Sequence, residues 1–384
     1  MNWILWPFGH NQIRGLGRQG TLCLQRPFGQ ILTLTFIILL LLAGAAEFIA
    51  RTDTFHALLI EPTMGSRHYQ LGRKLVRLDA LIKHEGPIDC LIIGSSMVDV
   101  GFDPQAFQEG YKQASGQDIR CFNFGIDAST AASAAAIAQM LVEDYQPRLL
   151  IYGTDARDYA VSPEDKEPAV ILESDWIQYR LGQFSLNGWL IEHSYFRRYR
   201  DHLFRLSRFQ LESLRSHATT DFGIMPDGFT PLAKVSTYIN DPPDLQDDSF
   251  EVRYNHKIFS SYEMLAENLD ALEKIMAHNQ PGTQLIVTEM PVADGLFYFF
   301  GSGKDDYQRF VAQVDKLAKA HQVPFWQTDA LEMIPDNGWF DYSHLNTIGA
   351  AIFSHWLGQQ VGEAVMQGSI VLSDQISPNT PAKD

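Results

Sequence analysis

Residues 89–97 read DCLIIGSSM, a short apolar run that ends in a glycine and two serines. The run from Asp89 to Ile93 predicts a buried strand, and the small residues after it predict a tight turn into a helix. Similar apolar runs recur along the chain, separated by longer amphipathic stretches, a pattern typical of a parallel α/β sheet. The expected strands cover residues 89–93, 119–124, 148–152, 284–288 and 323–326.

The stretches between these strands predict the helical layers of a three-layer α/β/α domain over residues 88–372. A linker and one helix are expected before it, at residues 51–87, and a disordered polar tail after it, at residues 373–384. A mainly helical insertion of about 100 residues is expected at 158–258. The other expected helices cover residues 130–145, 262–278, 305–321 and 348–366.

Composition excludes several classes of protein. The chain has 384 residues, of which 45% are hydrophobic and 20% charged, so it is globular rather than disordered. Its net charge of −16 argues against a nucleic-acid-binding surface. Cys90 and Cys121 lie in apolar runs and are expected to be buried free thiols. A disulfide between them is the alternative, if their strands are adjacent and the compartment oxidises. No metal motif occurs and no cofactor is implied.

The N-terminal region predicts a membrane anchor. Residues 28–46 contain no charged side chain, close to the length that a helix needs to cross a bilayer. Three arginines and no acid precede this run, so residues 1–27 are expected in the cytoplasm and the body outside it. The arm is long for a signal peptide, which favours an uncleaved transmembrane helix at 28–50 over a cleaved signal.

The insertion contains a basic stretch in an otherwise acidic protein. Residues 179–215 hold seven arginines and three acids, with apolar residues at helical spacing. A helix packed on the domain with a solvated arginine face explains this pattern. Contact with anionic lipid or polymer, or a lid over the site, is the alternative.

Two motifs at the ends of predicted strands suggest nucleophilic catalysis. Ser95 or Ser96 follows the first strand, where a hydroxyl can point out of the sheet and helix N–H groups favour an oxyanion. Asp341 and His344 precede the last helix, where the carboxylate can orient the imidazole. Alone, the serines could cap a helix and the pair could sit in a surface loop. Together, in the order Ser, Asp, His, they predict a catalytic triad, and the absence of GxSxG disfavours an ordinary α/β-hydrolase elbow.

At these residues the sequence resembles the SGNH/GDSL hydrolase family. Gly94–Met97 resembles its first block, Asn123–Thr130 its second, and Asp341 with His344 its last. The resemblance implies a flavodoxin-like sheet and a triad in which Ser96 is the nucleophile. It also implies an oxyanion hole formed by the N–H groups of Ser96 and Gly125.

One position departs from that family pattern. Asp155 stands where the family has an oxyanion-hole asparagine, and an ionised carboxylate cannot donate a hydrogen bond. Loss of one such donor costs roughly 3–4 kcal/mol of transition-state stabilisation. Three explanations are open: Asp155 is protonated, Arg157 supplies the donor, or the site is weak or inactive.

A narrower resemblance links the GSS sequence, the Asp–His pair and the anchor to extracytoplasmic SGNH-like proteins that modify surface polymers. These include teichoic-acid D-alanyl transfer and alginate O-acetyltransferase-type proteins, which often work beside a membrane-bound O-acyltransferase. The resemblance implies a serine esterase or O-acyltransferase acting on an extracytoplasmic glycan or polymer. The alternative is a non-catalytic binding module of a polymer-modification complex.

Overall fold

The apolar runs form one parallel sheet in the computed structural model, which describes residues 20–52, 55, 64, 68–205, 224–236, 239–328 and 332–373. The strand order is β2-β1-β3-β4-β5, the order of flavodoxin-like doubly wound sheets. The bounds are β1 Cys90–Gly94, β2 Cys121–Gly125, β3 Leu149–Thr154, β4 Gln284–Glu289 and β5 Phe325–Trp326.

The last strand is shorter than the sequence predicts. It pairs with β4 only through Phe325 and Trp326. Pro324 has no N–H to donate, and the N–H of Val323 bonds to Ala318 at the end of the preceding helix. The sheet therefore ends in a two-residue edge strand.

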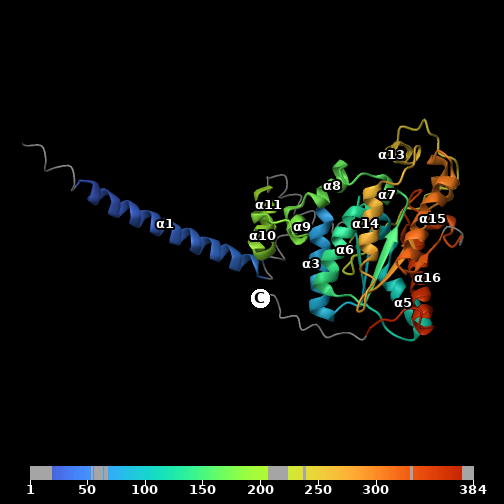
Figure 1. Cartoon of the computed structure of the whole chain (residues 1–384), viewed down its shortest axis with the longest axis horizontal. Coiled ribbons are helices and arrows are strands. Elements are labelled where there is room, and N and C mark those ends of the chain that lie inside the picture. Colours follow the sequence, from blue (N-terminus) through green and yellow to red (C-terminus); the bar gives the residue numbers. More distant parts are fainter. Residues whose placement is uncertain are drawn as a thin grey trace, which may run out of the picture. The chain divides into compact units, whose positions relative to one another are not determined.

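Helices cover both faces of the sheet (Figure 1). Successive strand residues face opposite sides, so Leu91 and Ile93 belong to one core and Cys90 and Ile92 to the other. The Leu91 side is covered by α3 Tyr69–Glu85, α6 Ala131–Tyr145, α14 Ala266–Met276 and α15 Lys304–Ala320. The Cys90 side is covered by α4 Ser96–Gly101, α5 Pro104–Ser115 and α16 Thr347–Met366.

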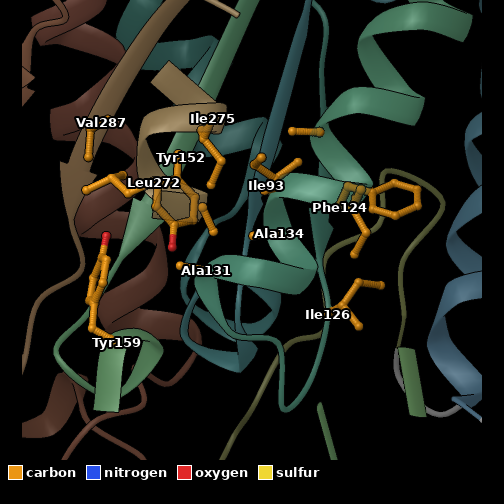
Figure 2. Close-up of a cluster of buried hydrophobic side chains, with 14 of the residues drawn as sticks. Ile93, Phe124, Ile126, Ala131, Ala134, Tyr152, Tyr159, Leu272, Ile275 and Val287 are labelled. Carbon is orange, nitrogen blue, oxygen red and sulfur yellow. The ribbon is translucent and has the colours of Figure 1, made fainter. Parts of the chain in front are cut away.

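Figure 2 shows part of the core on the Leu91 side, where side chains of the strands meet α6 and α14. Ile93, Tyr152 and Val287 project from β1, β3 and β4 toward Ala134 of α6 and Leu272 of α14. The alanine-rich sequence of α6 lets this helix lie close to the sheet, because its side chains add little volume. The sequence thus forms the predicted three-layer α/β/α arrangement.

The helix at residues 69–85 is part of the domain and not a spacer before it. Its side chains Leu71, Leu75 and Leu78 are buried in the core. Lys74 lies on the same face, is fully buried, and forms an ion pair with Asp99 of α4. The compact unit that contains the sheet accordingly begins at residue 60, earlier than the predicted boundary at 88.

The insertion between β3 and β4 is helical in its first part. It contains α7 Arg157–Ala160, α8 Lys166–Leu172, α9 Asp175–Arg180, α10 Leu186–His193 and α11 Tyr195–Arg205. The described residues from 224 to 249 are turns and extended chain, and α13 Phe250–Phe259 follows. More than half of the described residues between 158 and 258 are therefore helical, in agreement with the predicted mainly helical insertion, and the described residues from 224 to 249 are the non-helical part.

Cys90 and Cys121 form a disulfide, so the expectation of two free thiols is wrong. The two residues are direct partners in the register of β1 and β2, with Cα atoms 4.4 Å apart. Both side chains face the same side of the sheet, which is the geometry that a bridge between neighbouring strands needs. The bridge attaches the edge strand β2 to the strand that precedes the site.

The unit formed by residues 1–59 contains α1 Gly20–Ala50. Within it, Phe28–Ala50 has a mean hydropathy of 2.3, and in the described part of the chain this is the one helix long and apolar enough to cross a membrane. This statement rests only on the length and the composition of the helix. The arm before residue 20 and the tail after residue 373 lie outside the described residues.

Candidate active site

The predicted serine lies at the turn between β1 and α4. Gly94 ends the strand with φ 156°, and a Cβ atom there would lie 2.5 Å from the carbonyl oxygen of Gly153. Only glycine fits this close approach of β1 and β3. Ser95 is the N-cap of α4 and Ser96 its first residue, so the N–H of Ser96 has no partner within the helix.

Ser96, His344 and Asp341 form a continuous hydrogen-bonded chain, as the sequence predicts. Ser96 Oγ lies 2.8 Å from His344 Nε2. His344 Nδ1 lies 2.8 Å and 3.0 Å from the two carboxylate oxygens of Asp341. With the proton on Nδ1, Nε2 accepts from the serine hydroxyl, which is the arrangement that a serine nucleophile and its general base require.

The loop backbone fixes the carboxylate of Asp341. Its Oδ1 accepts the N–H groups of Ser343, at 2.9 Å, and His344, at 2.7 Å. Burial raises the pKa of Asp341, but the His344 interaction and these two amides outweigh it, so the pKa is lowered. The carboxylate therefore stays ionised beside the imidazole.

The pKa of His344 is shifted in the opposite direction. Burial lowers this pKa. The charge and the hydrogen bond of Asp341, together with the charges of Asp127 and Asp155, raise it by more, so the net shift is upward. The side chain of His344 keeps 25% of its surface exposed and that of Asp341 16%. The base is thus strengthened and reachable from solvent.

The N–H of Gly125, the predicted oxyanion donor, already has a hydrogen-bond acceptor in the structure. It donates to Asn123 Oδ1 at 2.9 Å, and both residues are buried. A Cβ atom at Gly125 would lie 2.3 Å from the backbone nitrogen of Asp99, so glycine is required for β2 to pass under α4. An oxyanion would have to compete with Asn123 for this N–H, whereas the N–H of Ser96 has no such competitor in α4.

Asp155 lies beside the nucleophile but accepts rather than donates. Its carboxylate receives the hydroxyl of Ser95 at 3.1 Å and the N–H of Arg157 at 2.7 Å. The side chain of Arg157, the predicted substitute donor, gives its Nε–H to Tyr254 and an Nη1–H to the Ser129 carbonyl. These contacts hold the ends of β3 and β1 together and do not restore the missing asparagine.

A second carboxyl group lies behind Asp155. Asp158 is buried, and burial together with the charge of Asp155 raises its pKa well above the usual range, against the opposing effect of Arg157. Its Oδ1 makes no hydrogen bond in the described part of the chain. Burial and the neighbouring carboxylate therefore both disfavour the ionised form of Asp158.

A buried polar network supports the site, and the sequence analysis missed it. Asp99 of α4 receives hydrogen bonds from Gln70, Lys74 and Thr230. Gln70 also accepts the N–H of Asp127, in the loop after β2, at 2.6 Å. The network joins α3 to the nucleophile helix and to that loop. The position of Lys74 in the sequence could have revealed this network. A lysine at the helical spacing of Leu71, Leu75 and Leu78 is expected on the buried face of the helix, where it needs a charged partner.

A cavity of about 350 Å³ lies beside the Asp341 loop. Its lining includes Val292, Asp294 and Trp339, and the N–H of Ala293 bonds to the carbonyl of Tyr342. Across the described residues, no group of three or more His, Cys, Asp or Glu side chains is arranged to hold a metal ion.

Comparison with known proteins finds no match: no family model, no curated protein and no solved structure is significantly similar to this chain.

Proposed function

We propose that this protein is a membrane-anchored, SGNH-like serine esterase or O-acyltransferase that acts on ester groups of an extracytoplasmic glycan or cell-surface polymer. The observation that carries the proposal is the hydrogen-bonded chain from Ser96 through His344 to Asp341. Ser96 and His344 are 248 positions apart in the sequence, so two distant segments, the turn after β1 and the Asp341–His344 loop, must fold correctly to bring the three residues together. A hydrogen bond from nucleophile to base, and a second from the base to a group that orients it, are the geometric criteria for an activated serine, and both distances are 2.8 Å here.

The chemistry follows from the geometry. Ser96 Oγ attacks the ester carbonyl carbon while its proton moves to His344 Nε2. The tetrahedral intermediate expels the alcohol, which takes that proton, and the acyl group remains on Ser96. Water then releases the acid in an esterase, or a sugar or polyol hydroxyl takes the acyl group in a transferase. Asp341 stabilises the imidazolium in both halves, and the N–H of Ser96 stabilises the oxyanion.

The extracytoplasmic location rests on two features of the chain. The α1 segment is long and apolar enough to act as an anchor, with the basic residues before it. The Cys90–Cys121 disulfide is a bond that persists in oxidising compartments and is rare in the cytosol. A membrane-bound O-acyltransferase is the partner class that the narrower family resemblance suggests.

Labelling with a fluorophosphonate probe tests the proposal. The full-length chain in detergent should form one adduct by intact mass, absent in Ser96→Ala and much slower in His344→Ala. Ser95→Ala, at the adjacent hydroxyl, is the matched control and should still be labelled. A folded protein that forms no adduct between about pH 6 and 9 would refute the enzyme proposal.

A specific observation favours the second candidate, a non-catalytic binding module. Asp155 replaces the expected amide donor, and the N–H of Gly125 is occupied by Asn123. Each oxyanion-hole donor that is lost costs roughly 10²–10³-fold in rate, and here only the N–H of Ser96 keeps no competing partner in α4. Retention of glycan or polymer binding by an unlabelled protein would support this candidate.

A further inference from the structure

The outer face of α10 is apolar, although it lies on the surface. Leu186, Trp189 and Leu190 follow one another at helical spacing, with 64%, 40% and 37% of their surfaces exposed. Phe184, just before the helix, is 78% exposed. We call these four residues the α10 face. Surface side chains of this size normally occur singly, and a contiguous group marks a contact site.

The orientation of α10 is set by its inner side and by its two ends. Gly188 lies so close to α9 that a Cβ atom there would be 2.3 Å from the carbonyl oxygen of Asp175, and Ile191 is buried. Ser185 caps the first turn, and Arg198 donates to the carbonyls of Ile191 and Glu192 at the other end. The helix cannot turn its apolar side inward without breaking these contacts.

Aromatic rings contact the α10 face, and the sequence around it is rich in arginine. Trp189 stacks on His193 at 4.9 Å, and Tyr179 meets the edges of both His193 and Phe184. Residues 175–200 contain four arginines and two acids, whereas the whole chain carries −16. Trp, Tyr, Leu and Phe beside arginine are the residues that interfacial segments place at the boundary of lipid headgroups and acyl chains.

The apolar side chains, more than the arginines, would supply the affinity. Arg197 donates to Asn187, and Arg198 holds the end of α10, so both act within the insertion. Exposed charges are screened by salt, but burial of large apolar side chains is not. The inference thus extends the sequence-based alternative of contact with anionic lipid by assigning most of the affinity to apolar side chains.

The chain itself indicates which partner the α10 face meets. The eighteen residues 51–68 connect α1 to α3 and can span at most about 60 Å. If α1 crosses the membrane, the second unit is held permanently within reach of the bilayer surface. A weak interfacial contact is then effectively intramolecular, and its local concentration is high.

We infer that the α10 face docks on the outer surface of the bilayer that holds α1, with Phe184, Leu186, Trp189 and Leu190 inserted at the headgroup boundary. The inference rests on the anchor in the proposed function, but not on the catalytic chemistry. Docking would fix the orientation of the sheet and its site with respect to the membrane.

Quenching of Trp189 in proteoliposomes tests the inference. The full-length chain is reconstituted in phosphatidylcholine–phosphatidylglycerol vesicles, with or without lipids brominated on the acyl carbons nearest the headgroup. The emission of Trp189, taken as the difference between the wild type and Trp189→Phe, should be lost with brominated lipid. Leu186→Ser with Leu190→Ser should weaken docking by about tenfold per side chain removed and restore this emission.

A matched control variant and the other possible outcomes distinguish docking on lipid from anchoring alone and from sugar binding. Met366→Ser with Val371→Ser removes two other exposed apolar side chains, 62% and 68% exposed, and should leave quenching unchanged. Vesicle-bound chain without Trp189 quenching would overturn the docking inference and leave the anchor standing. Failure to sediment with vesicles would overturn both. Quenching or a spectral shift caused by soluble oligosaccharides, and not by brominated lipid, would instead identify a sugar-binding platform.

Discussion

Ser95 and Ser96 are adjacent hydroxyls with different partners. Ser96 Oγ meets the imidazole of His344, while the buried Ser95 donates to Asp155. Neighbouring residues at a helix start point in different directions, so the GSS sequence serves both as a cap region and as a nucleophile. At this scale the sequence predicted Ser96, His344 and Asp341 correctly as a connected set. The sequence did not predict that Asn123 occupies the N–H of Gly125, because this N–H was considered only as an oxyanion donor.

The pH dependence of labelling should report the pKa of His344. Ser96 is activated only when His344 is neutral, so the rate rises as the pH passes upward through that pKa. Burial lowers this pKa, and Asp341 is the largest of the groups that together raise it by more. In Asp341→Asn the rising limb should therefore move to lower pH, and the plateau should fall by roughly 10⁴-fold, the scale of this loss in serine proteases. Fluorophosphonate labelling rates measured across the pH range check both effects, and an unmoved limb would contradict the assigned role of Asp341.

Asp155→Asn should make the site faster. The amide keeps the acceptor used by the N–H of Arg157, while its NH₂ group faces Ser95 and the site. The change removes a negative charge and adds a donor beside the oxyanion, and one donor is worth up to roughly 10²–10³-fold in rate. The labelling rate and the hydrolysis of a small acetyl ester are the measurements. A slower Asp155→Asn protein of unchanged stability would show that the carboxylate itself takes part in the reaction.

At the scale of elements, two helices on one side of the sheet set the distance between nucleophile and base. The α4–α5 segment follows Ser96, and α16 begins three residues after His344. These helices touch through glycines: a Cβ atom at Gly358 would lie 2.1 Å from the carbonyl oxygen of Phe107. Backbone contact of this kind makes the pair rigid.

Gly358→Ala should therefore affect both stability and the site. The added methyl group cannot fit without separating α16 from α5, which costs about 1–3 kcal/mol of unfolding free energy. The same shift would lengthen the Ser96–His344 hydrogen bond and slow labelling. Urea unfolding and labelling rates test this, with Glu363→Ala, at an exposed position of the same helix, as the control. Wild-type labelling in Gly358→Ala would show that α16 does not position the base.

The elements were predictable to different degrees. Four of the five strands are near-continuous apolar runs, and their positions agree with the sequence within a few residues. The helices α4 and α5 were not predicted, because Pro104, Gly101 and Gly110 obscure the helical pattern of residues 96–115. Asp103 nevertheless caps α5 by accepting two backbone N–H groups, and this Asp-Pro signature was present in the sequence.

At the scale of the whole molecule, the order of the strands determines that Cys90 and Cys121 can pair, and the sequence alone does not show that order. Cys90 and Cys121 are 31 residues apart, and nothing in their spacing reveals that β1 and β2 are neighbours in register. The pairing appears only when β2 takes the edge position of the sheet. A disulfide persists in oxidising compartments and is rare in the cytosol, so this bond supports the extracytoplasmic location that we propose.

The disulfide and the proposed location together predict which cysteines of the protein are free thiols. After denaturation without reductant, alkylation should modify Cys23 alone, and after reduction it should modify all three cysteines. Reduction should also lower the unfolding free energy by about 2–4 kcal/mol, because opening the loop between the cysteines frees the unfolded chain. Intact mass and urea unfolding with and without reductant measure the two effects, and Cys90→Ser with Cys121→Ser tests them without reductant. If Cys90 and Cys121 are alkylated in the unreduced exported protein, the bridge is absent, and the extracytoplasmic assignment then rests on α1 and its flanking arginines alone.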